Sequence, residues 1–255
     1  MKKLLIICFS LIIATTSNAL AKPKQIKFCV SPGVAPFVMA DTSNKITGGL
    51  DIDLAKALCE KTKSKCIFAP QKEITTIAAD LESGKCDAWI SGFTITPIRK
   101  KYMDFTDSYY PSTASLIASK NSSFTSSNKD LKGKKIGVTA GSNFVSYLDV
   151  SNSYDIEKNE FINEYDALAA LKSKKLDAVI ADTPLLHYWM QQKGNKGFRL
   201  IDLPEYNKAF SLGMGYGIPV KKGNTKLLTT LNRALAKIKA DGTYDKIVKK
   251  YFADQ

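Results

Sequence analysis

The sequence predicts an α/β protein with two similar lobes, each a mainly parallel sheet flanked by helices. Three observations lead to this prediction: an internal repeat, an alternation of short apolar segments with amphipathic ones, and small polar residues where predicted strands end. Alternating strands and helices are typical of parallel sheets whose faces are covered by helices. The 234 residues that follow a predicted signal peptide suffice for two such domains.

The internal repeat joins residues 79–90 to residues 169–180 at an offset of 90, and seven of the twelve positions are identical. Each copy ends an amphipathic helix, turns through small and charged residues, and enters a short apolar strand. A second similarity joins residues 30–33 to residues 138–141, and both segments follow a predicted strand. The repeat therefore predicts two lobes of similar construction.

Four predicted strands lead into segments that are rich in small polar residues. In chain order these segments are 31–36, 91–94, 139–143 and 181–184. Ligands of parallel sheets bind beyond the carboxyl ends of the strands, so four such segments predict one shared cleft. Taken singly, each segment is equally well explained as a turn that caps a helix.

The N-terminus has the pattern of a secretory signal peptide over residues 1–21. Lys2 and Lys3 precede an apolar run over residues 4–14, and residues 19–21 have the small-x-small form of a cleavage site. The apolar run is shorter than the ~20 residues that a membrane-spanning helix needs. We therefore expect an exported, periplasmic protein that begins near Lys22.

The charge of the mature chain is strongly basic, with 35 basic against 24 acidic residues. A basic balance raises the question of nucleic acid or an anionic membrane surface as partner. The basic residues are spread through predicted helices and turns, and no nucleic-acid motif is present. We interpret the charge as a solvated basic surface and expect no nucleic-acid partner.

Four cysteines remain after the predicted cleavage. Cys59 and Cys66 are close in sequence, and in an oxidising compartment such a pair predicts a disulfide. Two alternatives stay open for Cys29 and Cys86, a second disulfide or two small buried side chains, and we favour burial. His187 is the only histidine of the chain, so we expect no metal site.

Arg99 is a candidate ligand for an anion. Thr96 and Pro97 have the pattern of an N-cap and a first helical residue, which predicts Arg99 in a first helical turn. A cation opposes the helix dipole there unless an anion faces it, and a ligand carboxylate would be such an anion. The alternative is a salt bridge to Asp104 or Asp107.

Asp182 and the segment around Ser142 are candidates of opposite character. Asp182 follows an apolar strand and could bind an ammonium group; the alternative is an N-cap for the helix that begins at Pro184. Ser142 and Asn143 precede a predicted helix, whose backbone N–H groups could bind a carboxylate. Together with Arg99 these residues predict a site for a zwitterion.

Short motifs spread over the mature chain carry a resemblance to a known family: residues 35–37, 51–59 with Cys66, 87–99, 104–107 with Tyr109 and Tyr110, 130–134, 182–183, and 239–246. Together they resemble the polar amino-acid solute-binding proteins of ABC importers, family 3 type, and most closely the arginine-binding members. The resemblance implies the type II periplasmic-binding-protein fold, in which two crossing strands join the lobes.

The resemblance also implies lobe boundaries. Lobe 1 takes residues 22–111 and 213–255, and lobe 2 takes residues 112–212. The crossings then lie near Pro111-Ser112 and Leu212-Gly213.

The resemblance assigns roles around the ligand. Arg99 takes the α-carboxylate with backbone N–H groups of Thr94 and Asn143. Asp182, the Thr94 hydroxyl and a carbonyl of the 91–92 segment take the α-ammonium. With those that face the ligand side chain, the predicted ligand-binding residues are Ser31, Ser91, Gly92, Thr94, Arg99, Thr139, Ser142, Asn143 and Asp182.

The identity of the amino acid stays open between two alternatives. Ser31 matches the arginine-binding type, which favours arginine. Thr94 and Thr139 stand where arginine-binding relatives carry acids, and an unpaired buried guanidinium is costly. The second alternative is therefore glutamine or another neutral polar amino acid.

An enzyme of the cyclohexadienyl-dehydratase kind is the competing class on the same scaffold. It would need a general acid or base in the cleft, for which His187 and Glu73 are the candidates. We expect a binding protein without catalytic activity or cofactor. Its expected partners are a free amino acid and an inner-membrane ABC permease, and we expect a monomer.

Overall fold

The computed structural model describes residues 24–71, 73–125, 127–150, 155–206 and 215–252. The predicted signal peptide and the predicted crossing near Leu212-Gly213 lie outside these residues. Within the described part of the chain, every helix is too short or too polar to cross a bilayer.

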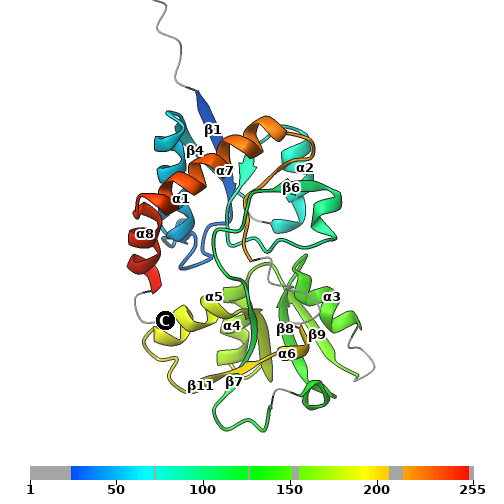
Figure 1. Cartoon of the computed structure of the whole chain (residues 1–255). Coiled ribbons are helices and arrows are strands. Elements are labelled where there is room, and N and C mark those ends of the chain that lie inside the picture. Colours follow the sequence, from blue (N-terminus) through cyan, green and yellow to red (C-terminus); the bar gives the residue numbers. More distant parts are fainter. Residues whose placement is uncertain (1–23, 72, 126, 151–154, 207–214, 253–255) are drawn as a thin grey trace, which may run out of the picture.

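Two five-stranded sheets form the framework, and they lie one above the other in Figure 1. The first sheet contains β1 (Gln25–Val30), β4 (Lys65–Pro70), β5 (Ala88–Trp89), β6 (Met103–Phe105) and β12 (Pro219–Lys221). The second contains β7 (Ala114–Ser119), β8 (Lys135–Thr139), β9 (Glu157–Phe161), β10 (Ala178–Asp182) and β11 (Phe198–Asp202). A separate hairpin pairs β2 (Met39–Ala40) with β3 (Ile46–Gly48).

The two sheets have the same plan, which confirms the predicted fold class. The strand orders are β4-β1-β5-β12-β6 and β11-β7-β10-β8-β9. β1 runs parallel to β4 and β5, and β8 runs parallel to β9 and β10. One strand in each sheet, β12 or β7, is antiparallel to both of its neighbours. The strands of the sequence repeat, β5 and β10, therefore hold equivalent places.

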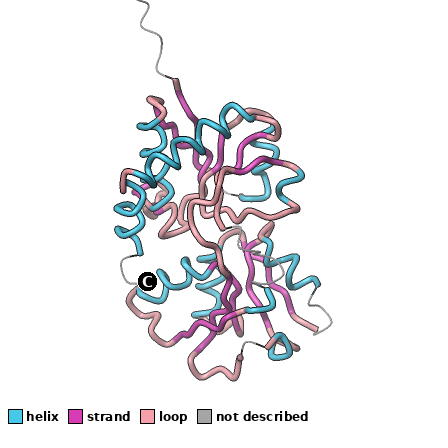
Figure 2. Tube along the Cα trace, viewed as in Figure 1, coloured by secondary structure: helices cyan, strands magenta, loops and turns pink. Residues whose placement is uncertain are grey.

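Helices cover the sheets, as Figure 2 shows along the whole trace. Those beside the first sheet are α1 (Leu50–Lys61), η1 (Ile74–Thr76), α2 (Ile77–Glu82), η2 (Arg99–Lys101), α7 (Thr225–Ala240) and α8 (Thr243–Phe252). Those beside the second are η3 (Asn128–Leu131), α3 (Asn143–Val150), α4 (Glu164–Lys172), α5 (Thr183–Gln191) and α6 (Pro204–Tyr206). α1 packs against α7 and α8, and its apolar face is buried through Ile52, Leu54 and Leu58.

The two segments that pass between the sheets pair with each other. The backbone N–H of Tyr216 donates to the carbonyl of Tyr110 at 2.8 Å, and that of Tyr109 donates to the carbonyl of Tyr216 at 2.9 Å. The rings of Tyr110 and Tyr216 stack with centroids 6.2 Å apart. We refer to the parts around the first and second sheets as lobe 1 and lobe 2. The boundaries given above stay a proposal.

Both cysteine pairs of lobe 1 form disulfides. Cys59 at the end of α1 is joined to Cys66 in β4, and Cys29 in β1 is joined to Cys86 just before β5. Cys29 and Cys86 are buried, as we favoured, but they are bonded to each other and are not two free thiols. Their bond ties two neighbouring strands whose cysteines are separated by 57 residues in the chain.

The two disulfides should differ in their effect on stability. In the chain-entropy model, a bond across 57 residues contributes about 4 kcal/mol and one across 7 residues about 2.5 kcal/mol. We expect the Cys29→Ala/Cys86→Ala variant to lose more free energy of unfolding than Cys59→Ala/Cys66→Ala. Urea denaturation of both variants and the wild type measures the difference. The opposite order would contradict the expectation.

Candidate ligand-binding site

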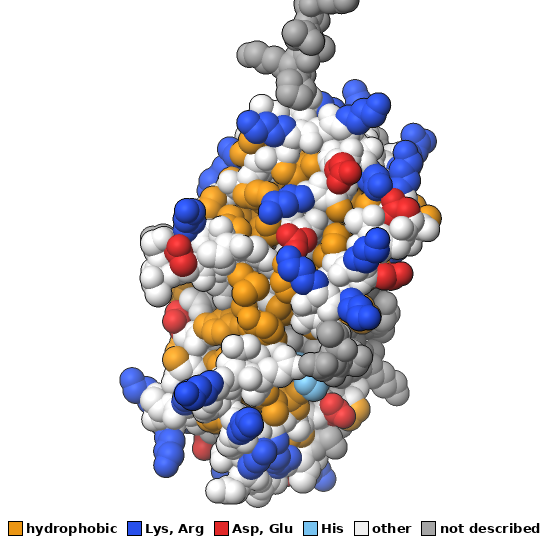
Figure 3. All heavy atoms as spheres, turned by 90° about the vertical axis from the view of Figure 1, so that its left-hand side faces the viewer, with side chains coloured by type: hydrophobic (Ala, Val, Ile, Leu, Met, Phe, Trp, Pro, Cys, Tyr) orange, Lys and Arg blue, Asp and Glu red, His pale blue; other side chains and the backbone are white. Residues whose placement is uncertain are grey.

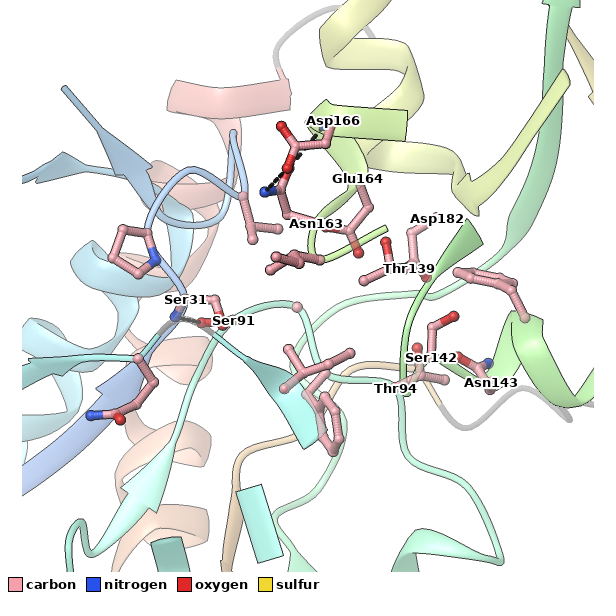
Figure 4. Close-up of a pocket in the computed structure, with 18 of the residues that line it drawn as sticks. Ser31, Ser91, Thr94, Thr139, Ser142, Asn143, Asn163, Glu164, Asp166 and Asp182 are labelled. Carbon is pink, nitrogen blue, oxygen red and sulfur yellow. Dashed lines mark hydrogen bonds between the residues drawn. The ribbon is translucent and has the colours of Figure 1, made fainter. Parts of the chain in front are cut away.

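A cavity of about 370 Å³ lies where the loops at the carboxyl ends of the parallel strands meet (Figure 4). This volume is typical of small-molecule sites. Nine of its lining residues are the nine named from the sequence: Ser31, Ser91, Gly92, Thr94, Arg99, Thr139, Ser142, Asn143 and Asp182. They come from both lobes, so the structure brings all nine to one place.

The lobe 1 edge of the cavity is fixed by hydrogen bonds between neighbouring strand ends. The Ser91 hydroxyl accepts from the backbone N–H of Ser31 at 2.8 Å and donates to the carbonyl of Ile90 at 2.6 Å. The backbone N–H of Gly92 donates to Asp51 Oδ2 at 2.6 Å. Burial raises the pKa of Asp51 to about 7, against the effect of this bond. Ser91 and Gly92 therefore shape the edge through contacts within the protein.

Arg99 lies in a shorter helix than the sequence predicted. Instead of an α-helix beginning near Pro97, the chain forms a single 3-10 turn, Arg99–Lys101. The N-cap of this turn is Ile98 and not Thr96 as predicted, although the Thr96 hydroxyl accepts from the backbone N–H of Arg99 at 3.2 Å. One turn has little dipole, so the dipole argument for an anion beside Arg99 loses its force.

The surroundings of the Arg99 guanidinium support a role in binding an anion. It lies 3.7 Å from the centroid of the Phe93 ring and donates to the carbonyl of Thr94 at 2.8 Å. Burial lowers the pKa of Arg99 to about 10, and the negative charge of Asp182 partly offsets this effect. The side chain therefore stays cationic at neutral pH and faces the cavity.

The predicted alternative for Arg99, a structural salt bridge, is not formed among the described residues. Asp104 instead pairs with Lys222 at 2.7 Å, and the ion pairs of the described chain do not include Asp107 or Arg99. Arg99 is thus a partly buried cation with no carboxylate at ion-pair distance among the described residues.

Asp182 is the counterpart of Arg99 on lobe 2. It occupies the N-cap position of α5, but its side chain makes no capping hydrogen bond. Its Oδ1 instead accepts from the Ser112 hydroxyl at 3.1 Å, and that hydroxyl lies 3.1 Å from Thr94 Oγ1. Asp182 therefore stands at the N-cap position without capping the helix through its side chain, which leaves its carboxylate available to a ligand.

Burial raises the pKa of Asp182 to about 7. The nearby negative charge of Glu164 adds to the rise, whereas the hydroxyls of Tyr216 and Ser112 and the charge of Arg99 oppose it. A positive group placed beside Asp182 would reverse the shift.

Two hydroxyls of the cavity, those of Ser31 and Ser142, are buried and lack a hydrogen-bond partner among the described residues. Buried polar atoms are nearly always satisfied, so such atoms at a cavity wall indicate groups for a ligand. Asn143 begins α3 beside them, and its side-chain amide donates to the hydroxyl of Tyr206.

Glu164 is a lining residue that the sequence patterns did not lead us to predict. It begins α4, where Asn163 is the N-cap and accepts from the backbone N–H of Asp166 at 2.9 Å. Figure 4 shows Glu164 beside the cavity, near Thr139 and Asp182. The cavity therefore has an acid at Glu164, although Thr94 and Thr139 stand where arginine-binding relatives carry acids.

A signal for Glu164 was present in the internal repeat. The offset of 90 places Glu164 opposite Ile74, and both residues line the cavity. The other unpredicted lining residues include Gln71, Phe93, Phe144 and Ile162.

The two residues considered for general acid or base chemistry lie elsewhere. His187 is exposed on α5, and Glu73 is exposed before η1, where its carboxylate accepts from the Thr75 hydroxyl at 3.2 Å. Neither is among the residues that line the cavity.

Comparison with known proteins decides the family. A family model described as "Bacterial extracellular solute-binding proteins, family 3" matches residues 26–254. The chain belongs to this family. The match confirms the resemblance predicted from the motifs.

Individual relatives in this family agree with that assignment. The chain is 38% identical over 260 residues to ABC transporter arginine-binding protein 1 of Escherichia coli (strain K12), covering 99% of each. A solved ancestral arginine-binding protein bound to arginine has a TM-score of 0.81 and 37% identity, covering 89% of this chain and 98% of that one. An ancestral arginine-binding protein bound to glutamine has a TM-score of 0.80 and 37% identity, covering 90% and 98%.

The raised pKa of Asp182 predicts that its ionised carboxylate lowers the free energy of unfolding of the ligand-free protein. Because folding raises this pKa from 3.8 to about 7, the carboxylate costs stability as the pH rises through that range. We expect Asp182→Asn to stabilise the ligand-free protein by about 1–3 kcal/mol at pH 8. At pH 4 the wild-type carboxyl is largely protonated when folded, so most of this gain should disappear.

Urea denaturation at the two pH values measures this difference. An equal effect of Asp182→Asn at pH 4 and pH 8, or a loss of stability at pH 8, would contradict the assignment of a desolvated carboxylate.

Proposed function

We propose that this chain is the periplasmic substrate-binding component of an amino-acid ABC transporter. It binds a polar or basic L-amino acid, with arginine as the foremost ligand, between its lobes and delivers it to a membrane permease. The observation that carries the proposal is that Arg99 and Asp182 reach one cavity from different lobes without pairing into a salt bridge.

These two groups match the main chain of an α-amino acid. The Arg99 guanidinium is oriented by Phe93 and by the carbonyl of Thr94, which occupies one of its donors, so it can offer other donors to a carboxylate. The backbone at the start of α3, at Asn143, adds N–H groups. Asp182 and the Thr94 hydroxyl take the ammonium, and they are already linked through Ser112.

The ligand side chain decides between arginine and a neutral amino acid such as glutamine. Ancestral relatives have been solved with either ligand, so likeness to them alone does not separate the two. The closely similar Escherichia coli protein is named for arginine. The acid Glu164, which faces the cavity beside Thr139, favours a basic ligand.

The same proposal includes the location of the protein and its partners. Residues 1–21 act as a cleaved signal peptide and bring the mature protein to the periplasm. It works there as a monomer, needs no cofactor, and hands its ligand to an inner-membrane permease. Binding rather than catalysis is supported by the exposed positions of His187 and Glu73 outside the cavity.

Replacing Arg99 by Ala should abolish measurable binding of arginine and leave the fold intact. Truncating one partner of a desolvated charge pair costs about 2–5 kcal/mol, roughly 30- to 5,000-fold in affinity. Isothermal titration calorimetry with L-arginine measures the loss. Lys101→Ala is the matched control, since Lys101 lies in the same turn, is exposed and does not line the cavity.

Binding by Arg99→Ala within threefold of the wild type would remove Arg99 from the site. The proposal of an amino-acid ligand would then lose its main residue-level support.

A further inference from the structure

The cavity is lined by more negative charges than the ammonium group of an amino-acid main chain can neutralise. Among the described lining residues, the ionisable side chains are Arg99, Glu164, Asp166 and Asp182. A bound zwitterion pairs its carboxylate with Arg99 and its ammonium with Asp182, if the proposed function holds. Two acids then remain: Asp166, which is exposed, and Glu164, which is partly buried and left without a cation.

The position of Glu164 makes that remaining charge costly. It is partly buried, and its carboxylate is hydrogen-bonded to the hydroxyl of Thr139, which is itself buried. Burial raises the pKa of Glu164 more than this bond and its own backbone N–H lower it. Its charge also raises the pKa of Asp182, so the two carboxylates are close enough to repel each other.

Stabilisation of helix α4 does not explain Glu164. An acid in a first helical turn is favoured by the helix dipole, and this lowers its pKa when the group is solvated. Asp166 already fills that role at the surface, since it is exposed and accepts from the Asn163 amide at 2.8 Å. Both acids line the cavity, but Glu164 is the partly buried one, and its pKa is raised by burial, which is the opposite of the shift expected for a solvated acid in a first turn.

The cavity near Glu164 also suits the stem of a long side chain. Val34, Ile74 and Ile162 line it, and they offer apolar contacts to methylene groups. The buried hydroxyl of Ser31, which has no partner among the described residues, lies at the same cavity. An apolar stem with a cationic end therefore satisfies groups that a short neutral side chain leaves unpaired.

We propose that Glu164 determines the specificity of this protein by binding the cationic end of the ligand side chain. The proposal rests on the proposed function and adds the residue that selects a basic amino acid over a neutral one. In this chain Glu164 supplies, from the start of α4, the acid that Thr94 and Thr139 lack.

The test compares arginine with citrulline, whose side chain has nearly the same shape but no charge. Calorimetry should show that the wild type binds L-arginine at least about 30-fold more tightly than L-citrulline. Glu164→Gln should bring this preference within about threefold, mainly by weakening arginine, because the amide keeps the size of the side chain but removes its charge. Glu160→Gln removes an exposed acid of β9 that does not line the cavity, so it is the control and should keep the wild-type preference.

Glu164→Asp keeps the charge on a shorter side chain and should still prefer arginine over citrulline. Circular dichroism checks that each variant is folded. An unchanged preference in Glu164→Gln, a loss of preference in Glu164→Asp equal to that in Glu164→Gln, or a wild type that prefers citrulline would each overturn the role of Glu164. Should Glu164→Gln not fold, Glu164→Asp and the wild type decide alone. Failure of the wild type to bind any amino acid would instead overturn the proposed function.

Discussion

The central constraint in the described part of this protein is that charged side chains are partly removed from water without an ion-pair partner. Arg99 and Asp182 both have pKa values shifted toward the neutral form by burial, and so does Glu164. Neutral donors and acceptors, chiefly the Ser112 and Thr139 hydroxyls, support these groups. A desolvated charge is stabilised most by a ligand group of opposite charge. The desolvation free energy that destabilises the ligand-free protein is therefore offset on binding, which favours ligands that carry those charges.

The loops can hold these charges because their backbone is fixed by interactions away from the ligand. Asp51 is fully buried beneath the cleft and accepts from Gly92, while Ser91 fastens the end of one strand to Ser31 at the end of the next. Gly92 has φ of 60°, and a Cβ there would lie 3.2 Å from the ring of Phe37. The loop therefore favours glycine, and the hydrogen bonds to Asp51 and Ser31 hold the cavity wall without help from a ligand. On the face shown in Figure 3, Lys and Arg side chains are spread over both lobes and alternate with acidic and apolar side chains.

The sequence was informative where apolar strands end in polar loops, since eight of the nine predicted residues lie in those segments and line the cavity. Arg99 came from a predicted helix start, and the family resemblance supplied the roles of the full set. Glu164 was missed because the strand before it, β9, is a polar edge strand without an apolar run, although the repeat places it opposite Ile74. The helix at Arg99 was misjudged because residues typical of an N-cap fix neither the first residue of a helix nor its length. The Cys29–Cys86 bond depends on strand pairing across 57 residues, which local patterns do not determine.

The arrangement of the three charges around the cavity is chiral. Arg99, Asp182 and Glu164 line the cavity from three separate segments, and each suits a different group: a carboxylate, an ammonium and a charged side chain. Those three groups are arranged around the α-carbon in opposite order in mirror-image amino acids. A site that fixes all three can be filled completely by one enantiomer only, so the cleft would distinguish handedness with no residue dedicated to that task.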